Sequence, residues 1–430
     1  MIKKLGYVII TAILSGLLES IIIGYSGYII FTLILFFIVS SDIIFFNYSS
    51  ARYLSNIDIR REVNTRIFRK NKTFEINIVF KNNNNNDVSF YFFDEALDIL
   101  NISENHSGII KIRKKSTVTK KYEITPRYIG KYSLGDITII MRDIFDLAYS
   151  ERKYCNTMEI KIYPSANDIR SQRTEMLSSF IYTYGIHYSK KAGQGYDLYG
   201  IRPYTENDDF RYIAWTRYDE SNDILMVKEM EEEREITVIF LLDYSNSMNF
   251  GGDDKIYDKT VTNIINAAYY MVKNRDNVGF FIYSSEHNYF IKPDKSGNSI
   301  KDFETKIASI LPGGDFDFES AIKILNKRTG KKPLIFVMTA SDINIKKPEY
   351  AFNVIIFIID HTSFYNYNPS EPLQDLLMRG LYSSQISRLR LVRSSIIRMG
   401  YRADVVQDKT MLPKIMEEYN YARSINLGAV

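Results

Sequence analysis

An acid and two serines follow an apolar run in the segment LLDYSNSMNFGG, residues 241–252. Asp243, Ser245 and Ser247 alternate along the chain, so their side chains can converge on one point in the loop that leaves a buried strand. A carboxylate and two hydroxyl groups are hard oxygen donors of the kind that bind Mg²⁺, with water completing the coordination shell. An alternative is that Asp243 and Ser245 cap a following helix, a common role for both residue types. The triplet by itself is compatible with either role.

Predicted strands and helices alternate from residue 236 to residue 430, which favours a doubly wound, Rossmann-like α/β domain with a mainly parallel sheet. The predicted strands are ITVIFLL, NVGFFIY, PLIFVMT, NVIIFII and RADVV, and helices are expected near 260–273, 300–310, 318–327, 373–399 and 412–423. Ligands in such folds bind beyond the carboxyl ends of the strands. Asp243, Ser245 and Ser247 follow the first of these strands, where a ligand is expected.

Two apolar segments open the chain, Leu5 to Ile23 and Tyr28 to Phe46, each of nineteen residues. As helices, each would be about 28 Å long at about 1.5 Å per residue, close to the thickness of the hydrocarbon layer of a membrane. We therefore expect a transmembrane helical hairpin over residues 1–50. A cleaved signal peptide is the alternative. The second apolar segment and the lack of a small-residue cleavage pattern disfavour it.

Basic residues flank this hairpin unevenly. Lys3 and Lys4 precede the first apolar segment, and Arg52, Arg60 and Arg61 follow the second, whereas the connecting turn has neither Lys nor Arg. The positive-inside rule then places both ends of the hairpin in the cytoplasm. The expected location is the cell membrane, with two spans and with the soluble domains in the cytoplasm.

Short segments rich in β-branched and aromatic residues, such as TFEINIVF and VSFYFF, follow the hairpin. Separated by polar turns, they predict a β-sandwich over residues 54–164. The asparagine run Asn82–Asn86 between these two strands is expected to form a hairpin loop that tolerates left-handed conformations. Residues 165–235 are then a connecting region, and residues 236–430 form the α/β domain.

Composition narrows the classes of function. The 430 residues include 55 basic and 51 acidic side chains, with a formal charge of +4, which gives no reason to expect a nucleic-acid partner. One cysteine and four histidines argue against a disulfide framework and a structural zinc site. No GxxxxGKS or GxxxxGKT motif occurs, so we expect no nucleotide site in this chain. No arrangement of Ser, Cys or His suggests a nucleophile with its base, and we do not expect an enzyme.

Two other groups of residues are conspicuous. A polar and aromatic cluster is expected to be structural or to face a partner, although a lone tryptophan is more often a core residue; its members are Asp208, Asp209, Arg211 and Trp215. The predicted helix near 373–399 carries four arginines that could meet anionic lipid or an acidic partner, or form a solvated face; they are Arg388, Arg390, Arg393 and Arg398.

The segment DYSNSM, residues 243–248, resembles the Asp-x-Ser-x-Ser motif of the metal-ion-dependent adhesion site in von Willebrand factor type A domains. A wider resemblance is to the membrane-anchored domain of unknown function 58 family. Its hallmarks resemble three segments found here in the same order, after the same paired apolar segments: GKYSLGDITIIMRDIFDL, GQGYDLYGIRPYTENDDFRYIAW and ILMVKEMEEEREITVIFLLDYSNSM. The resemblance covers essentially the whole chain and implies a von Willebrand factor type A fold for residues 236–430.

By this resemblance Asp243, Ser245 and Ser247 would be metal ligands, with Mg²⁺ as the cofactor. Two positions depart from the family pattern. The segment PGGDFDF places Asp315 where the family has a threonine after paired glycines, and the second acid, which normally ends the strand near residue 339, is displaced to Asp342. Such a site either binds Mg²⁺ only when a partner supplies a carboxylate or has lost its metal.

The resemblance also implies a function. The protein would be a membrane-tethered protein-interaction module that acts with a MoxR-type AAA+ ATPase in the chaperone-like maturation of client proteins. It would present the metal loop to an acidic residue of the client or of the ATPase. Two alternatives remain open: a metal-dependent hydrolase that uses Asp243 and Asp315 with Mg²⁺, and a structural protein of the cell envelope.

Overall fold

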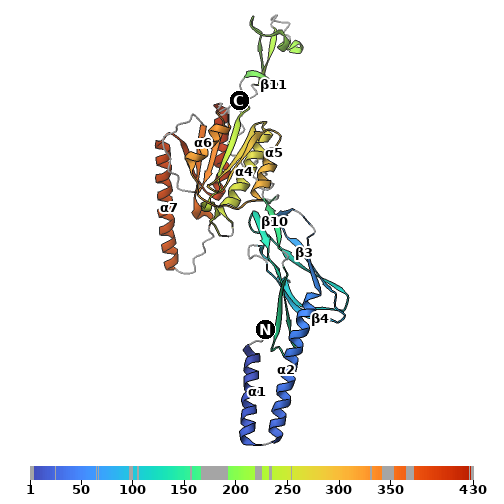
Figure 1. Ribbon diagram of the computed structural model, residues 1–430. Coiled ribbons are helices and arrows are strands. Elements are labelled where there is room, and N and C mark those ends of the chain that lie inside the picture. Colours follow the sequence, from blue (N-terminus) through green and yellow to red (C-terminus); the bar gives the residue numbers. More distant parts are fainter. Residues whose placement is uncertain are drawn as a thin grey trace. The chain divides into compact units, whose positions relative to one another are not determined.

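The computed structural model describes residues 4–24, 26–63, 65, 67–95, 100–103, 106–154, 157–165, 192–217, 225–231, 235–252, 254–329, 332–340, 353–364, 372–425 and 427. The chain divides into two compact units, Met1–Tyr163 and Pro164–Val430. The first unit contains two long helices and three sheets. The second contains a mainly parallel sheet with helices packed on it, and a separate two-stranded sheet (Figure 1).

The two apolar segments form the helices α1 (Lys4–Ile23) and α2 (Ser26–Ser55), which lie side by side as a hairpin (Figure 1). Within them, Gly6–Ile23 and Ser26–Ser55 are long and apolar enough to cross a membrane. A Cβ atom on Gly16 would lie 3.8 Å from Cγ2 of Thr32, in ordinary van der Waals contact, so the two helices pack against each other here without requiring a glycine.

Helix α2 continues past residue 50, where the hairpin was expected to end. Phe46 and Leu54, near its C-terminal end, are buried in the core of the sheets that follow. The last turns of α2 therefore belong to the packing of the β domain as well as to the apolar helix, because their side chains complete its core.

Among the residues that the structure describes, ten strands follow α2 in the first unit: β1 (Ile57–Val63), β2 (Phe68–Arg69), β3 (Phe74–Asn82), β4 (Val88–Asp94), β5 (Ser107–Ile112), β6 (Thr117–Ile124), β7 (Gly130–Leu134), β8 (Ile137–Arg142), β9 (Tyr149–Tyr154) and β10 (Met158–Tyr163). They form three sheets with the orders β1-β3-β6, β2-β10-β7 and β5-β4-β8-β9. Alternate residues of β3 are buried, as expected for a strand with one face on a core. One apolar core contains residues from all three sheets, which is the packing expected of a β-sandwich.

The asparagine run Asn82–Asn86 does not form the expected hairpin loop. It connects β3 to β4, which belong to different sheets, and none of its five residues has a positive φ. Instead, buried amide side chains satisfy backbone groups: Nδ2 of Asn82 donates to the carbonyl of Asn86 over 2.9 Å, and Nδ2 of Asn84 donates to the carbonyl of Tyr53 over 3.0 Å. The run thus joins two sheets and holds the end of α2.

A charged pair lies inside the sandwich. Arg61 forms an ion pair with Asp94, and the side chains of both are almost completely buried. The hydroxyl of Tyr122 donates to Oδ2 of Asp94 over 2.6 Å. Burial, with a further effect of the Asp94 charge, raises the pKa of Tyr122 well above its ordinary value.

The second unit contains a six-stranded sheet with the order β15-β14-β13-β16-β17-β18. Its strands are β13 (Thr237–Asp243), β14 (Asn277–Tyr283), β15 (Asn288–Asp294), β16 (Leu334–Thr339), β17 (Asn353–Ile359) and β18 (Arg402–Val406). All neighbours are parallel except β14 and β15. The five expected strands are present, and the antiparallel edge strand β15 was not predicted. The strand order reverses at β13 and β16, so the carboxyl ends of these two strands form the switch point where ligands bind in doubly wound folds.

Among the described residues of this unit, four α-helices lie between these strands and a fifth follows β18: α4 (Ile256–Lys273), α5 (Asn298–Ile307), α6 (Phe318–Arg328), α7 (Pro372–Arg398) and, after β18, α8 (Asp408–Ser424). Helices α6 and α7 pack on the sheet face that carries Ile239 and Leu241, and α4 contacts α5 and α8. In Figure 1, α4 and α5 lie on the opposite side of the sheet from α7. The second unit is therefore doubly wound, as expected from the alternation of its strands and helices.

Candidate functional site

The loop after β13 contains the predicted acid and serines. A short 3-10 helix, η5 (Asn246–Asn249), follows Ser245, whose side chain makes no capping hydrogen bond. Helix α4 begins only at Ile256, with Lys255 at its N-cap position. The helix-cap interpretation of Asp243 and Ser245 is therefore wrong. Oδ1 of Asp243 instead accepts the backbone N–H of Ser245 over 2.9 Å, which shapes the loop itself.

Four polar side chains converge at this loop. Oδ2 of Asp243 accepts a hydrogen bond from Oγ1 of Thr339 over 2.7 Å and a longer one from Oγ of Ser247 over 3.5 Å. The Oγ atoms of Ser245 and Ser247 are 2.9 Å apart. Asp243, Ser245 and Thr339 are buried. The switch point therefore holds one carboxylate and three hydroxyl groups that are linked in a chain of hydrogen bonds.

Thr339 is the residue of this group that the sequence did not identify. It ends β16, and the register pairs Leu242 with Met338, so Thr339 lies next to Asp243 at the end of the neighbouring strand. The signal was present as a polar residue closing the apolar run PLIFVMT. It could be interpreted only once β16 was known to lie beside β13.

A second loop, which carries Asp315, is held against the first. The N–H of Gly313 donates to the carbonyl of Tyr244, and the N–H of Asn246 donates to the carbonyl of Gly314, each over 2.9 Å. Gly314 has a φ of +73°, and a Cβ atom there would lie 2.3 Å from Oγ of Ser285, so this position requires glycine. The structure thus brings the Asp315 loop to the site.

Two further acids were predicted as metal ligands outside the first loop, Asp315 and Asp342, and the structure describes only the first of them. The side chain of Asp315 is exposed, and its backbone N–H donates to Oγ of Ser285 over 2.9 Å. Asp342 lies outside the described residues. Within the part of the chain that the structure describes, no group of three or more His, Cys, Asp or Glu side chains could hold a metal ion. The described donors are thus of the type that Mg²⁺ prefers, but Asp243 is the only buried acid among the four converging side chains.

A cavity of about 400 Å³ opens beside this loop, between the carboxyl ends of the strands and α7. It is lined by Ser247, Ala340, Ile358, His361, Gln385, Arg388 and Leu389. Nε2 of His361 is 2.6 Å from the carbonyl of Ala340, so this nitrogen is the one that donates. Arg388 contributes a cationic group to the wall. Arg393 of the same helix is paired with Asp404 over 3.1 Å.

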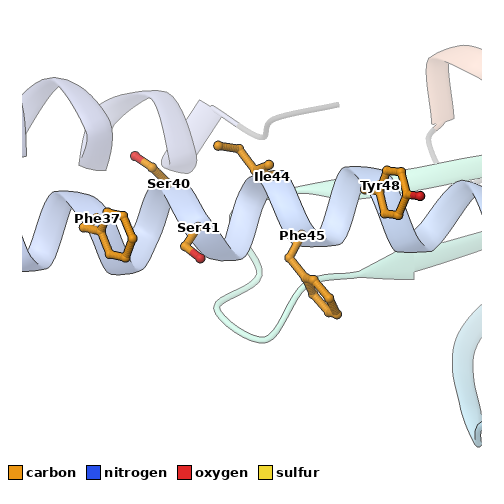
Figure 2. A pocket seen from close by; sticks show the side chains of 6 residues that line it. All are labelled: Phe37, Ser40, Ser41, Ile44, Phe45 and Tyr48. Atoms are coloured by element: carbon orange, nitrogen blue, oxygen red, sulfur yellow. The ribbon is translucent and has the colours of Figure 1, made fainter.

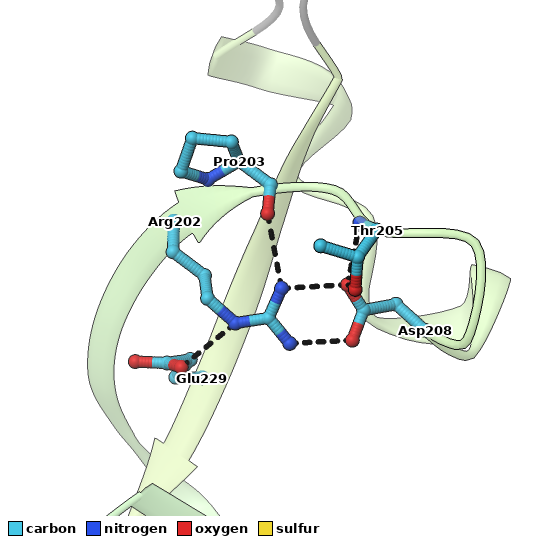
Figure 3. Close-up of polar contacts among 5 residues, drawn as sticks. All are labelled: Arg202, Pro203, Thr205, Asp208 and Glu229. Atoms are coloured by element: carbon cyan, nitrogen blue, oxygen red, sulfur yellow. Dashed lines mark hydrogen bonds and ion pairs between the residues drawn. The ribbon is translucent and has the colours of Figure 1, made fainter.

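The predicted polar and aromatic cluster lies between β11 (Ala192–Pro203) and β12 (Met226–Glu231), which pair antiparallel. As Figure 3 shows, the guanidinium of Arg202 joins the two carboxylates of Asp208 and Glu229, donating through Nη1 to Oδ2 of Asp208 over 2.6 Å and through Nε to Glu229 over 2.8 Å. Oδ2 of Asp208 also accepts the N–H of Thr205 over 2.8 Å. These bonds, that of Arg202 above all, hold the pKa of Asp208 well below its usual value.

Aromatic side chains next to this network face outward. Trp215 is 68% exposed and Phe210 is 67% exposed. Trp215 therefore does not take the core position that is more common for a lone tryptophan, and the cluster remains a candidate partner-facing element. Asp209 pairs with Arg211 over 2.6 Å in the same segment. The cluster is a rigidly hydrogen-bonded turn region that presents aromatic rings at its surface.

Residues 200–347 match a family model described as protein of unknown function DUF58. The VWA domain of SpRpn10 is 14% identical and matches 43% of this chain and 95% of its own, with a TM-score of 0.26. An aerotolerance-related membrane protein of Bacteroides fragilis is 18% identical and matches 29% of this chain and 66% of its own, with a TM-score of 0.23. BatB of Bacteroides thetaiotaomicron is 15% identical and matches 29% of this chain and 67% of its own, with a TM-score of 0.22. No curated protein matches the chain.

Proposed function

We propose that this protein is a membrane-tethered protein-interaction module that binds an acidic side chain of a partner protein at the loop 243–247. The observation that carries the proposal is the convergence of Ser245, Ser247 and Thr339 on the buried carboxylate of Asp243, at the switch point of the sheet. Oxygen donors grouped in this way suit Mg²⁺, which would be held by Asp243, Ser245 and Ser247 and would supply the positive charge that a partner carboxylate needs.

The surroundings of the loop favour an acidic ligand. Asp243 is the single buried acid among the four converging side chains, so a carboxylate from a partner would complete the charge balance of a divalent site. The adjacent cavity adds the guanidinium of Arg388, which can donate hydrogen bonds to an anion. Both features point to a binding function, and Asp243 already accepts hydrogen bonds on both oxygens, which leaves it poorly suited to act as a general base.

The partner we propose is a MoxR-type AAA+ ATPase together with its client proteins. Two observations support this choice: the motif resemblance of the chain and the absence from its sequence of a phosphate-binding GxxxxGKS or GxxxxGKT loop, so that any ATP hydrolysis must come from another protein. Helices α1 and α2 would anchor the module in the membrane, and the flanking basic residues would keep its domains in the cytoplasm.

Calorimetric titration of the full-length protein tests the metal loop. The protein is titrated with Mg²⁺ and Mn²⁺, and then with the partner ATPase in Mg²⁺ or in EDTA. We expect the wild type to bind the partner more tightly in Mg²⁺, and Asp243→Ala to lose this difference. Asp302→Ala, which removes an exposed acid of α5, is the matched control and should behave like the wild type. Unchanged partner binding by Asp243→Ala would refute the metal loop.

A further inference from the structure

The turn between β8 and β9 has a well-defined shape. Oδ1 of Asp143 accepts the N–H groups of Leu147 over 2.7 Å and of Ala148 over 3.1 Å, and the N–H of Asp143 donates to the carbonyl of Ala148 over 3.1 Å. Asp146 adopts a left-handed φ of 56°. Because these bonds close the turn at its base, its tip is held in one conformation.

The tip of this turn consists of two consecutive large apolar residues that point away from the core. Ile144 is 88% exposed and Phe145 is 53% exposed, whereas Leu147 at the base is buried. Keeping apolar surface in water costs about 25 cal/mol per Å². A rigid turn that holds two such side chains outward is therefore better suited to an apolar environment than to water.

The turn lies beside the apolar helix α2. The carboxyl group of Asp42 on α2 meets that of Asp143, and one oxygen of each group is buried. The contact places the tip residues next to the final turns of the predicted membrane span, which ends at Phe46.

The surface of α2 at this level is itself apolar and aromatic. Phe37, Ile44, Phe45 and Tyr48 are all exposed. Together with Ser40 and Ser41 they line a shallow hollow of about 440 Å³ along the helix (Figure 2). Aromatic residues gather at the level where a membrane span meets the headgroups. The β8–β9 turn, which meets α2 at Asp42, thus lies at the level of this apolar surface.

We propose that Ile144 and Phe145 insert into the lipid bilayer that α2 crosses, so that the β8–β9 turn is a second membrane attachment of the β-sandwich. The occupant of this surface is the bilayer, because the turn meets α2 at Asp42, within the predicted span Tyr28–Phe46, at the level of exposed apolar residues of α2. The inference rests on the proposal that α2 spans a membrane. Its consequence is that the β-sandwich is held at the membrane surface by two elements instead of by a single helix.

Depth-dependent fluorescence quenching tests this attachment in the full-length protein, reconstituted in phosphatidylcholine vesicles with or without brominated acyl chains. In a Cys155→Ser background, which removes the only cysteine, single cysteines are introduced by Ile144→Cys or Phe145→Cys and labelled with an environment-sensitive dye. Lys72→Cys is the control, because Lys72 is exposed and precedes β3 at the end opposite the asparagine run that contacts α2. Ile34→Cys, exposed within α2, is the reference for a membrane span.

We expect blue-shifted emission and quenching by brominated lipid for labels at 34, 144 and 145, and neither effect at 72. Quenching at 34 without quenching at 144 and 145 would overturn the inference while leaving the membrane hairpin intact. A label at 34 that is not quenched would instead remove the proposed membrane anchor, and the inference with it. Because all four labelled side chains are exposed, the substitutions should not disturb the core.

Discussion

Thr339 donates a hydrogen bond from its hydroxyl group to Oδ2 of Asp243 over 2.7 Å, and so joins the carboxyl ends of β16 and β13. Both residues are completely buried. A buried carboxylate needs such donors, because in the protein interior it has lost the hydrogen bonds of water. This contact therefore orients the acid around which the candidate metal loop is built.

Replacing Thr339 by valine removes this donor and keeps the shape of the side chain. We expect Thr339→Val to lower the free energy of unfolding by about 1–3 kcal/mol, the usual cost of leaving a buried polar group without its partner. Thr339→Ser should retain most of the stability. Denaturant unfolding followed by circular dichroism measures the effect. Thr305→Val, at an exposed threonine of α5, is the control, and an equal loss in that variant would contradict the proposed role of Thr339.

Because Arg202 is paired with Asp208, we expect the structure of the segment around them to depend on pH. Arg202 lowers the pKa of Asp208 in the folded protein, so the pair stabilises the segment above the pKa of an unfolded aspartate, about 3.9, and this contribution is lost as the pH falls through the lower folded pKa. The fluorescence of Trp215, the only tryptophan, reports on this segment. We expect it to stay constant from neutral pH down to about 4, and to change in stronger acid.

Two variants refine this pH experiment. Asp208→Asn removes one carboxylate from Arg202 and should give the altered Trp215 emission already at neutral pH. Glu206→Gln changes an exposed acid of the same turn and should match the wild type. If Asp208→Asn also retained the wild-type emission, the ion pair would have no part in positioning the exposed aromatic side chains.

The buried ion pair of Arg61 and Asp94 should determine much of the stability of the β-sandwich. Arg61→Met leaves the carboxylate of Asp94 buried without its cation, which typically costs about 3–5 kcal/mol. The double variant Arg61→Met/Asp94→Leu should recover part of that loss, because no uncompensated charge remains. Thermal unfolding provides the comparison. Arg60→Met, at the exposed neighbouring arginine, should change stability by less than about 0.5 kcal/mol. Equal losses of stability in Arg60→Met and Arg61→Met would contradict the conclusion that Arg61 compensates the buried charge of Asp94.

The proposed topology predicts protection from external protease. If both ends of the hairpin are cytoplasmic, protease added to intact cells should leave the chain after residue 50 whole, and the same protease should digest it once the cells are permeabilised. Immunoblotting with an antibody against the C-terminal region distinguishes the two results. Digestion in intact cells would place the domains outside and exclude a cytoplasmic ATPase as partner.

The sequence alone was sufficient to predict the apolar helices, the central strands and the loop at Asp243. Such predictions succeed because side-chain direction repeats every two residues in a strand and about every 3.6 residues in a helix, so burial leaves a local pattern. In β13, every residue from Val238 to Asp243 is buried, and the segment is a continuous apolar run until its last residue. β15 was missed because it is an edge strand, half exposed, and contains Lys292 and Pro293.

Only the tertiary structure decided which distant residues meet. Thr339 is 96 positions from Asp243, and it joins the site because β16 is the neighbour of β13 in the sheet. The asparagine run was expected to close a hairpin because consecutive strands usually pair, whereas β3 and β4 entered different sheets. Trp215 proved to be exposed for a similar reason, since burial depends on what packs against a side chain. Strand pairing and packing join segments far apart in the chain, and a local pattern of residues carries no information about that choice.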